Sequence, residues 1–141
     1  MEYTYKMWKS SDIYNFDIEF NRIESYNKYC KDWLYSYYGT TLPIQIKNDW
    51  TMEDIIDLTN YNNLKSNVNA CVSRINSIYN VETTKILTII DTYNQSFDYY
   101  KANEIEEMLK DYLSKLGSLQ FLYNVSGLTT SGNNLKLNGV M

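Results

Sequence analysis

Apolar residues recur at spacings of three and four along three stretches of the chain, which is the pattern of amphipathic helices. The clearest stretch runs from about Asn15 to Tyr38 and predicts a helix with one buried face. Ser11 or Asp12 is its candidate N-cap, and Gly39 is the expected C-terminal glycine. The predicted buried stripe of this helix holds Phe16, Phe20, Ile23, Asn27, Cys30 and Leu34.

Two further stretches carry the helical pattern. The second begins at Thr51, where Thr51-Met52-Glu53-Asp54 resembles a capping box with Asp in its last position, and ends near Asn80. Its middle, from Asn60 to Asn69, is unusually polar, which predicts a bend or a solvated face. The third runs from about Tyr99 to Leu116, and either Gly117 closes it or residues 119–122 add a turn.

The segment from Lys85 to Tyr93 is ambiguous. Its β-branched residues suit a strand, whereas its place between helical patterns suits a short helix, and the helix is favoured. After Tyr123 the pattern changes to glycine-containing turns around Leu135-Lys136-Leu137, which alternates like a short strand. A tail of this kind forms no core of its own, so it is either disordered or an arm that orders against a neighbouring subunit.

These patterns together predict an all-α fold. We expect a three- to four-helix bundle over residues 1–123, followed by an extended, glycine-punctuated C-terminal arm over residues 124–141. A length of 141 residues fits one domain with a real core.

An internal echo divides the predicted bundle into similar units. Trp8 and Trp50 each begin the pattern Trp-x-x-x-Asp-Ile, and a helical stretch follows each one. Asn21-Arg22-Ile23-Glu24 then has partial counterparts in Asn62-Asn63-Leu64-Lys65 and Asn103-Glu104-Ile105-Glu106. The Trp would pack as a staple at the start of the helix while the Asp caps it or faces its dipole. Chance likeness between capped helices is the alternative to two or three degenerate units of roughly 40 residues.

The repeated motif resembles one in small tail and tail-fibre-associated structural proteins of bacteriophages of low-GC Gram-positive bacteria. The second unit departs from it, because Asn62-Asn63-Leu64-Lys65 lacks both the Arg and the Glu. The resemblance implies a virion part present in several copies, assembled in the host cytoplasm, whose partners are other virion proteins and further copies of itself. It rests on Trp8, Asp12, Phe20, Asn21, Arg22, Ile23, Glu24, Trp50, Asp54, Ile55, Asn103, Ile105 and Glu106.

Composition narrows the choice of partner. The net charge is −4 and the basic residues are scattered, so nucleic acid is not an expected partner. No run of about 18 apolar residues predicts a membrane span, and the N-terminus lacks the apolar region of a signal peptide. Cys30 and Cys71 fall in apolar helical patterns, as expected for two buried free thiols in a reducing compartment. The 15 tyrosines fit either selection for an interface or AT-rich coding DNA.

The sequence offers no motif for catalysis. The chain has no histidine, so the commonest catalytic base and metal ligand is missing. There is no glycine-rich phosphate loop, and the acidic pairs Glu53 with Asp54 and Glu104 with Glu106 and Glu107 are expected at helix starts or on exposed faces. We therefore expect no enzyme, no cofactor and no metal site.

What remains are surfaces for protein partners. Arg22 and Glu24 flank the stripe position Ile23, where they would set register if buried between helices or subunits. Trp8 and Trp50 would staple the fold or anchor a partner, and the staple is favoured. The candidate partner-binding residues are Trp8, Arg22, Glu24, Trp50, Leu135 and Leu137. The rival to a virion part is a soluble regulatory or inhibitory protein that binds a host or viral protein.

Overall fold

Three α-helices form the bundle, and one short 3-10 helix precedes the second of them. The computed structural model describes residues 3–56, 58–89 and 99–129, with residues 55, 56 and 123–129 as backbone only. Helix α1 spans Phe16–Tyr38, η1 spans Met52–Ile56, α2 spans Leu58–Ile78 and α3 spans Tyr99–Thr129. Within the described ranges there is no strand, so the predicted all-α class is confirmed with three helices.

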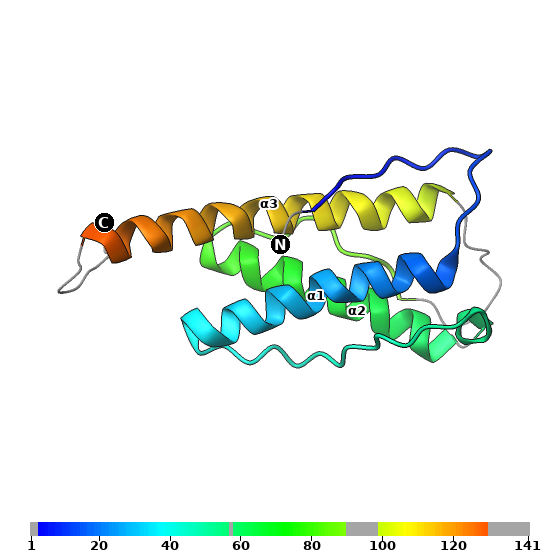
Figure 1. The fold of residues 1–141 in the computed structure, drawn as a ribbon, viewed down its shortest axis with the longest axis horizontal. Helices are drawn as coiled ribbons and strands as arrows, with labels where there is room; N and C mark the ends of the chain where they lie inside the picture. Colours follow the sequence, from blue (N-terminus) through cyan, green and yellow to red (C-terminus); the bar gives the residue numbers. More distant parts are fainter. Residues whose placement is uncertain (1–2, 57, 90–98, 130–141) are drawn as a thin grey trace.

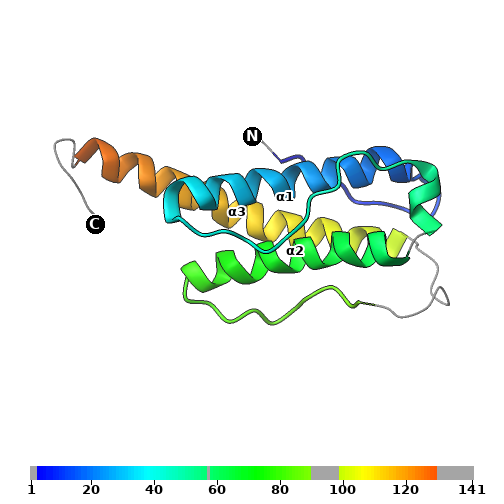
Figure 2. The same ribbon diagram turned by 90° about the horizontal axis from the view of Figure 1, so that it is seen from below.

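The three α-helices run in the same direction, with their N-terminal ends at one end of the bundle (Figure 1). Short loops would have made neighbouring helices antiparallel. Here the chain leaves each of the first two helices and turns back along the bundle in an extended conformation (Figure 2). We call residues 39–51 the first return segment and residues 79–89 the second return segment. Each of the three helices contacts the other two.

The structure corrects the prediction for the segment after α2. Residues 85–89 are extended, so the favoured helix over Lys85 to Tyr93 is wrong for this part, and residues 90–93 lie outside the described residues. Within 85–89 only Leu87 is buried. A single buried side chain fits an extended segment lying on a helix better than an amphipathic helical turn, which would bury several.

Helix α3 continues well past Gly117, where the sequence suggested an end. Leu116 and Leu119 are both buried, so the apolar face continues across the glycine and offsets its cost of about 1 kcal/mol in a helix interior. The helix ends at Thr129 and therefore includes residues 124–129, which were predicted to begin the arm. The rest of the predicted arm, residues 130–141, lies outside the described residues.

The ends of α1 match the prediction at one end only. Gly39 has φ 64° and donates its N–H to Tyr35 O at 3.1 Å, which confirms it as the terminal glycine. The N-cap is Asn15, without a side-chain hydrogen bond, so neither Ser11 nor Asp12 caps the helix. The Asp12 carboxylate accepts instead the N–H of Lys9, three residues earlier, at 2.8 Å.

Residues at equivalent positions of the internal echo are also buried together in the core. Ile23, Leu64 and Ile105 are fully buried, one on each helix, and they follow one another in two steps of 41 residues (23, 64 and 105). Cys30, Cys71 and Tyr112 repeat the same two steps (30, 71 and 112) and are also fully buried. Both cysteines are free thiols, as predicted. Equivalent positions of three successive units thus point into one shared core.

Candidate assembly site: asparagine clasps and buried carboxylates

On each helix, one asparagine side chain binds both the N–H and the C=O of a single residue in an extended segment. In α1, Asn21 Oδ1 accepts the N–H of Trp50 at 2.9 Å, and Asn21 Nδ2 donates to the Trp50 carbonyl at 3.4 Å. In α3, Asn103 makes the same pair of bonds with Trp8, at 2.6 and 2.9 Å. We call this arrangement an asparagine clasp. Extended backbone outside a sheet needs partners for its N–H and C=O groups, and the amide supplies one of each.

The third clasp lies on α2 and is shifted along the helix. Asn69 binds the N–H and the carbonyl of Leu87 at 2.7 and 2.9 Å. It lies seven residues, or two helical turns, beyond Asn62, the residue that the sequence echo aligns with Asn21 and Asn103. All three helices therefore hold an extended segment by the same chemistry, although the second does so at another register.

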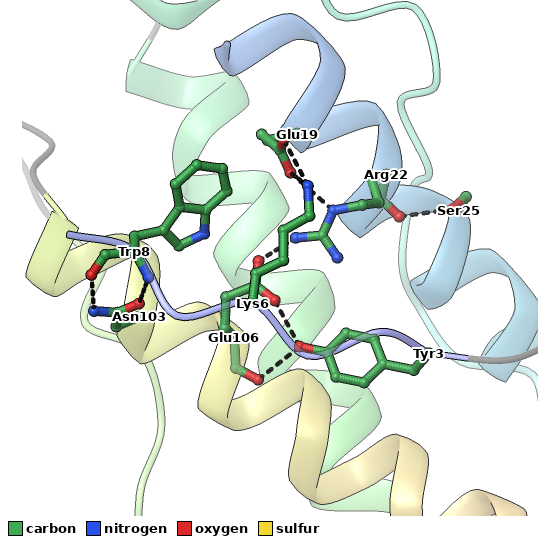
Figure 3. Close-up of polar contacts among 8 residues, drawn as sticks. All are labelled: Tyr3, Lys6, Trp8, Glu19, Arg22, Ser25, Asn103 and Glu106. Carbon is green, nitrogen blue, oxygen red and sulfur yellow. Dashed lines mark hydrogen bonds and ion pairs between the residues drawn. The ribbon is translucent and has the colours of Figure 1, made fainter. Parts of the chain in front are cut away.

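The segments run antiparallel to the helices that hold them. On α1, Glu24 accepts the N–H of Lys47 while Asn21, one turn earlier, binds Trp50. On α2, Asn76 binds Thr83 and Asn69 binds Leu87. We call residues 3–15 the N-terminal segment; its residues 3–8 lie along α3 in the same sense, because Tyr3 binds Glu106 while Trp8 binds Asn103 (Figure 3).

The two tryptophans of the repeated motif differ in burial. Trp50 is 3% exposed and its ring packs edge-on against Phe20, with centroids 5.0 Å apart, so it staples the return segment to the core. Trp8 is half-buried, and its ring lies 4.6 Å from that of Tyr14. Asp54 accepts the N–H of Thr51 at 2.8 Å, as the predicted capping box requires, but the box starts η1, and α2 begins only at Leu58. Asp12 accepts the N–H of Lys9 in the same way.

Arg22 lies in an ion-pair network at the junction of α1, α3 and the N-terminal segment (Figure 3). Its guanidinium pairs with Glu106 and, at 2.8 Å, with Glu19, which also pairs with Lys6 at 3.0 Å. Burial alone would lower the pKa of Arg22, but the two carboxylates raise it above its ordinary value. Burial and the hydrogen bond to Glu106 raise the pKa of Tyr3, so this hydroxyl remains a donor at neutral pH.

Glu24 is fully buried and no cation pairs with it among the described residues. Its carboxylate accepts hydrogen bonds from Asn27 at 2.9 Å, from Asn67 at 3.0 Å and from the backbone N–H of Lys47 at 2.9 Å. Asn67 is buried, so the polar middle of α2 is not the solvated face that the sequence suggested. Glu24 thereby joins α1, α2 and the first return segment.

Burial raises the pKa of Glu24 above 4.5, although the bonds from Asn27, Lys47 and Asn67 oppose this shift. The folded protein therefore takes up this proton at a higher pH than the unfolded chain does. Between the raised pKa and about 4.5, stability should rise as the pH falls, by the contribution of this one group. We expect urea unfolding to show the advantage of the wild type over Glu24→Gln growing from pH 7 to pH 5. A difference in unfolding free energy between the wild type and Glu24→Gln that stays constant from pH 7 to pH 5 would contradict the raised pKa of Glu24.

The predicted partner-binding residues thus fall into three groups. Arg22, Glu24 and Trp50 are bound within the chain, where they join helices and a return segment. Trp8 is half-buried and remains partly accessible. Leu135 and Leu137 lie outside the described residues.

Sequence reasoning missed Glu106, which was expected on an exposed face but is 1% exposed. Its position in the third copy of the echo, where it matches Glu24, was the available signal. Asn103 and Asn21, the first residues of the same motif, were recognised as an echo but not as ligands of the two tryptophan backbones.

The fold and the site together define a parallel three-helix bundle whose extended segments are held by side-chain amides. Comparison with known proteins found no match, whether among family models, curated sequences or solved structures. Among the described residues, no helix combines the length and the apolar character needed to cross a membrane.

Proposed function

We propose that this protein is a structural component of a bacteriophage virion, in the tail, neck or host-attachment apparatus, and acts by subunit-subunit assembly rather than by catalysis. The repeated Trp-x-x-x-Asp motif and its resemblance to phage tail-associated proteins support this role. The clasps add a physical reason for the motif, because the Trp of one unit binds the Asn of another: Trp8 binds Asn103, and Trp50 binds Asn21.

The observation that carries the proposal is the projecting end of α3. This helix has 31 residues against 23 in α1, and it extends beyond the ends of α1 and α2 (Figures 1 and 2). On the projecting part, Phe121 is 68% exposed and Leu122 is 56% exposed. At the same end of the bundle, α1 presents Tyr35, Tyr37 and Tyr38 to solvent. Exposed apolar and aromatic side chains are the anchors expected of a protein interface.

Replacing both anchors should weaken self-association without harming the fold. We expect Phe121→Ser with Leu122→Ser to shift the protein from oligomer to monomer in size-exclusion chromatography with light scattering. The midpoint of thermal unfolding of the monomer should change little, since both side chains are exposed. The matched control is Tyr100→Ser, because Tyr100 is an exposed aromatic near the opposite end of the same helix.

The same measurement separates the proposal from its rival. A regulatory or inhibitory protein would be a clean monomer until it meets its target. A wild-type chain that stays monomeric at high concentration, and that is indistinguishable from the double variant, would contradict self-assembly through this end of α3. The C-terminal arm with Leu135 and Leu137, crossing to a neighbouring subunit, stays a prediction from the sequence.

A further inference from the structure

The third helix is paired with a segment from the other end of the chain. The first and second return segments lie on α1 and α2, the helices they directly follow. The equivalent place on α3 is held by residues 3–8, which precede α1 and are separated from their α3 partners by 95 to 103 positions. Helix α3 therefore binds a segment that is distant in the sequence, whereas α1 and α2 each bind the segment that directly follows them.

This closing contact is polar at both ends. Trp8 is clasped by Asn103, and Tyr3 donates to the carboxylate and to the backbone carbonyl of Glu106, at 2.6 and 3.1 Å. Between them, Lys6 pairs with Glu19 of α1 at 3.0 Å. These directional bonds fix the register of the segment on α3.

The N-terminal segment also differs from the other two in having no fully buried residue. No residue from 3 to 15 is fully buried, whereas the first return segment buries Leu42, Ile44 and Trp50, and the second buries Leu87. The connection from Lys9 to Ile13 is exposed throughout, and Ile13 itself is 82% exposed. Releasing residues 3–8 from α3 would therefore uncover the half-buried rings of Tyr3, Tyr5 and Trp8 but no fully buried side chain of the segment, while the polar partners on α3 and α1 would stay in place.

We propose that the face of α3 around Asn103 and Glu106 is an acceptor site for the N-terminal segment of a second copy of this chain. In an exchanged pair, Trp8 and Tyr3 of one copy make on the neighbouring α3 the bonds that they make here within one chain. Identical contacts form in both arrangements, so the linker from Lys9 to Asn15 decides between them. The inference deepens the proposed assembly function and rests on it, because it names the segment and the surface that join copies.

Mixing two full-length variants tests the exchange directly. One chain carries Trp8→Cys and the other carries Asn103→Cys, two positions that the clasp brings together. After the two proteins are incubated together and oxidised, exchange predicts a disulfide-linked heterodimer of twice the chain mass on a non-reducing gel. The matched control replaces Asn103→Cys by Ser118→Cys, at an exposed position on the same helix, and should give no more than background cross-linking. Equal yields from the two mixtures would overturn the proposal.

A second variant acts through the linker and leaves the acceptor site intact. The background is Phe121→Ser with Leu122→Ser, which is expected to be monomeric. Deleting Ser10 and Ser11 in it shortens the exposed connection, so that residues 3–8 no longer reach their own α3, and the mass measured by light scattering should double. Inserting two glycines after Ser11 in the same Phe121→Ser, Leu122→Ser background should leave the chain monomeric. A shortened chain that remains a folded monomer would overturn the proposed exchange of N-terminal segments. The proposed function has a separate test, and it would fail if the protein were absent from particles.

Discussion

Arg22→Met should destabilise the protein by about 3–5 kcal/mol, because it leaves the carboxylates of Glu19 and Glu106 without their shared buried partner. Glu106 is 1% exposed and Glu19 is 6% exposed, so water cannot replace the guanidinium. Lys6 still pairs with Glu19, and the largest share of the loss should therefore come from Glu106. Urea unfolding at pH 7 measures the change in the free energy of unfolding.

Two variants make this measurement specific. Lys28→Ala removes an exposed ion pair with Asp32 in the same helix and should change stability by less than about 1 kcal/mol. Adding Glu106→Leu to Arg22→Met should recover most of the loss, since it removes the unpaired buried carboxylate. If Arg22→Met and Lys28→Ala cost the same, the network is not the buried junction that the structure describes.

Trp50→Ala should cost about 3–5 kcal/mol, the usual loss for a fully buried large aromatic side chain. The ring fills the space between Phe20 and the first return segment, and the surrounding helices cannot close around a cavity of that size. Thermal and urea unfolding should agree on the loss, which should appear with no change in oligomeric state.

Trp8→Ala is the matched variant, because Trp8 occupies the equivalent position in the repeated motif but is only half-buried. Its clasp uses backbone atoms and survives the substitution. We expect a loss of less than about half that of Trp50→Ala, in proportion to the smaller buried area. Equal losses would show that the N-terminal segment is held as firmly as the first return segment, which would contradict the smaller burial of Trp8.

The helical part of this fold was readable from local pattern. The spacing of Phe16, Phe20, Ile23, Cys30 and Leu34 predicted α1, and Gly39 marked its end. The relative direction of the helices could not be predicted, because hydrophobic periodicity shows which face of a helix is buried but not whether neighbouring helices are parallel or antiparallel. The parallel arrangement depends on the long return segments, whose alternation of buried Leu42 and Ile44 with exposed neighbours is too short to be decisive alone.

The polar contacts were harder to predict because they join residues far apart in the chain. Arg22 meets Glu106 across 84 positions, and Trp8 meets Asn103 across 95. A local reading placed Glu106 on a solvated face because its sequence neighbours are charged, although the third helix turns it toward Arg22. The match to Glu24 in the internal echo was the signal that linked Glu106 to the protein interior, and such a match does not identify Arg22 as the partner of Glu106.

Quantitative mass spectrometry of purified particles tests the central claim most directly. Under the proposed function, particles of the bacteriophage should contain the chain at a fixed ratio to the other virion proteins, retained after washing in high salt. If the chain is absent from particles, or is present at a variable ratio that high salt removes, it is not a structural part of the virion. The rival reading, a soluble binding protein, would then take its place.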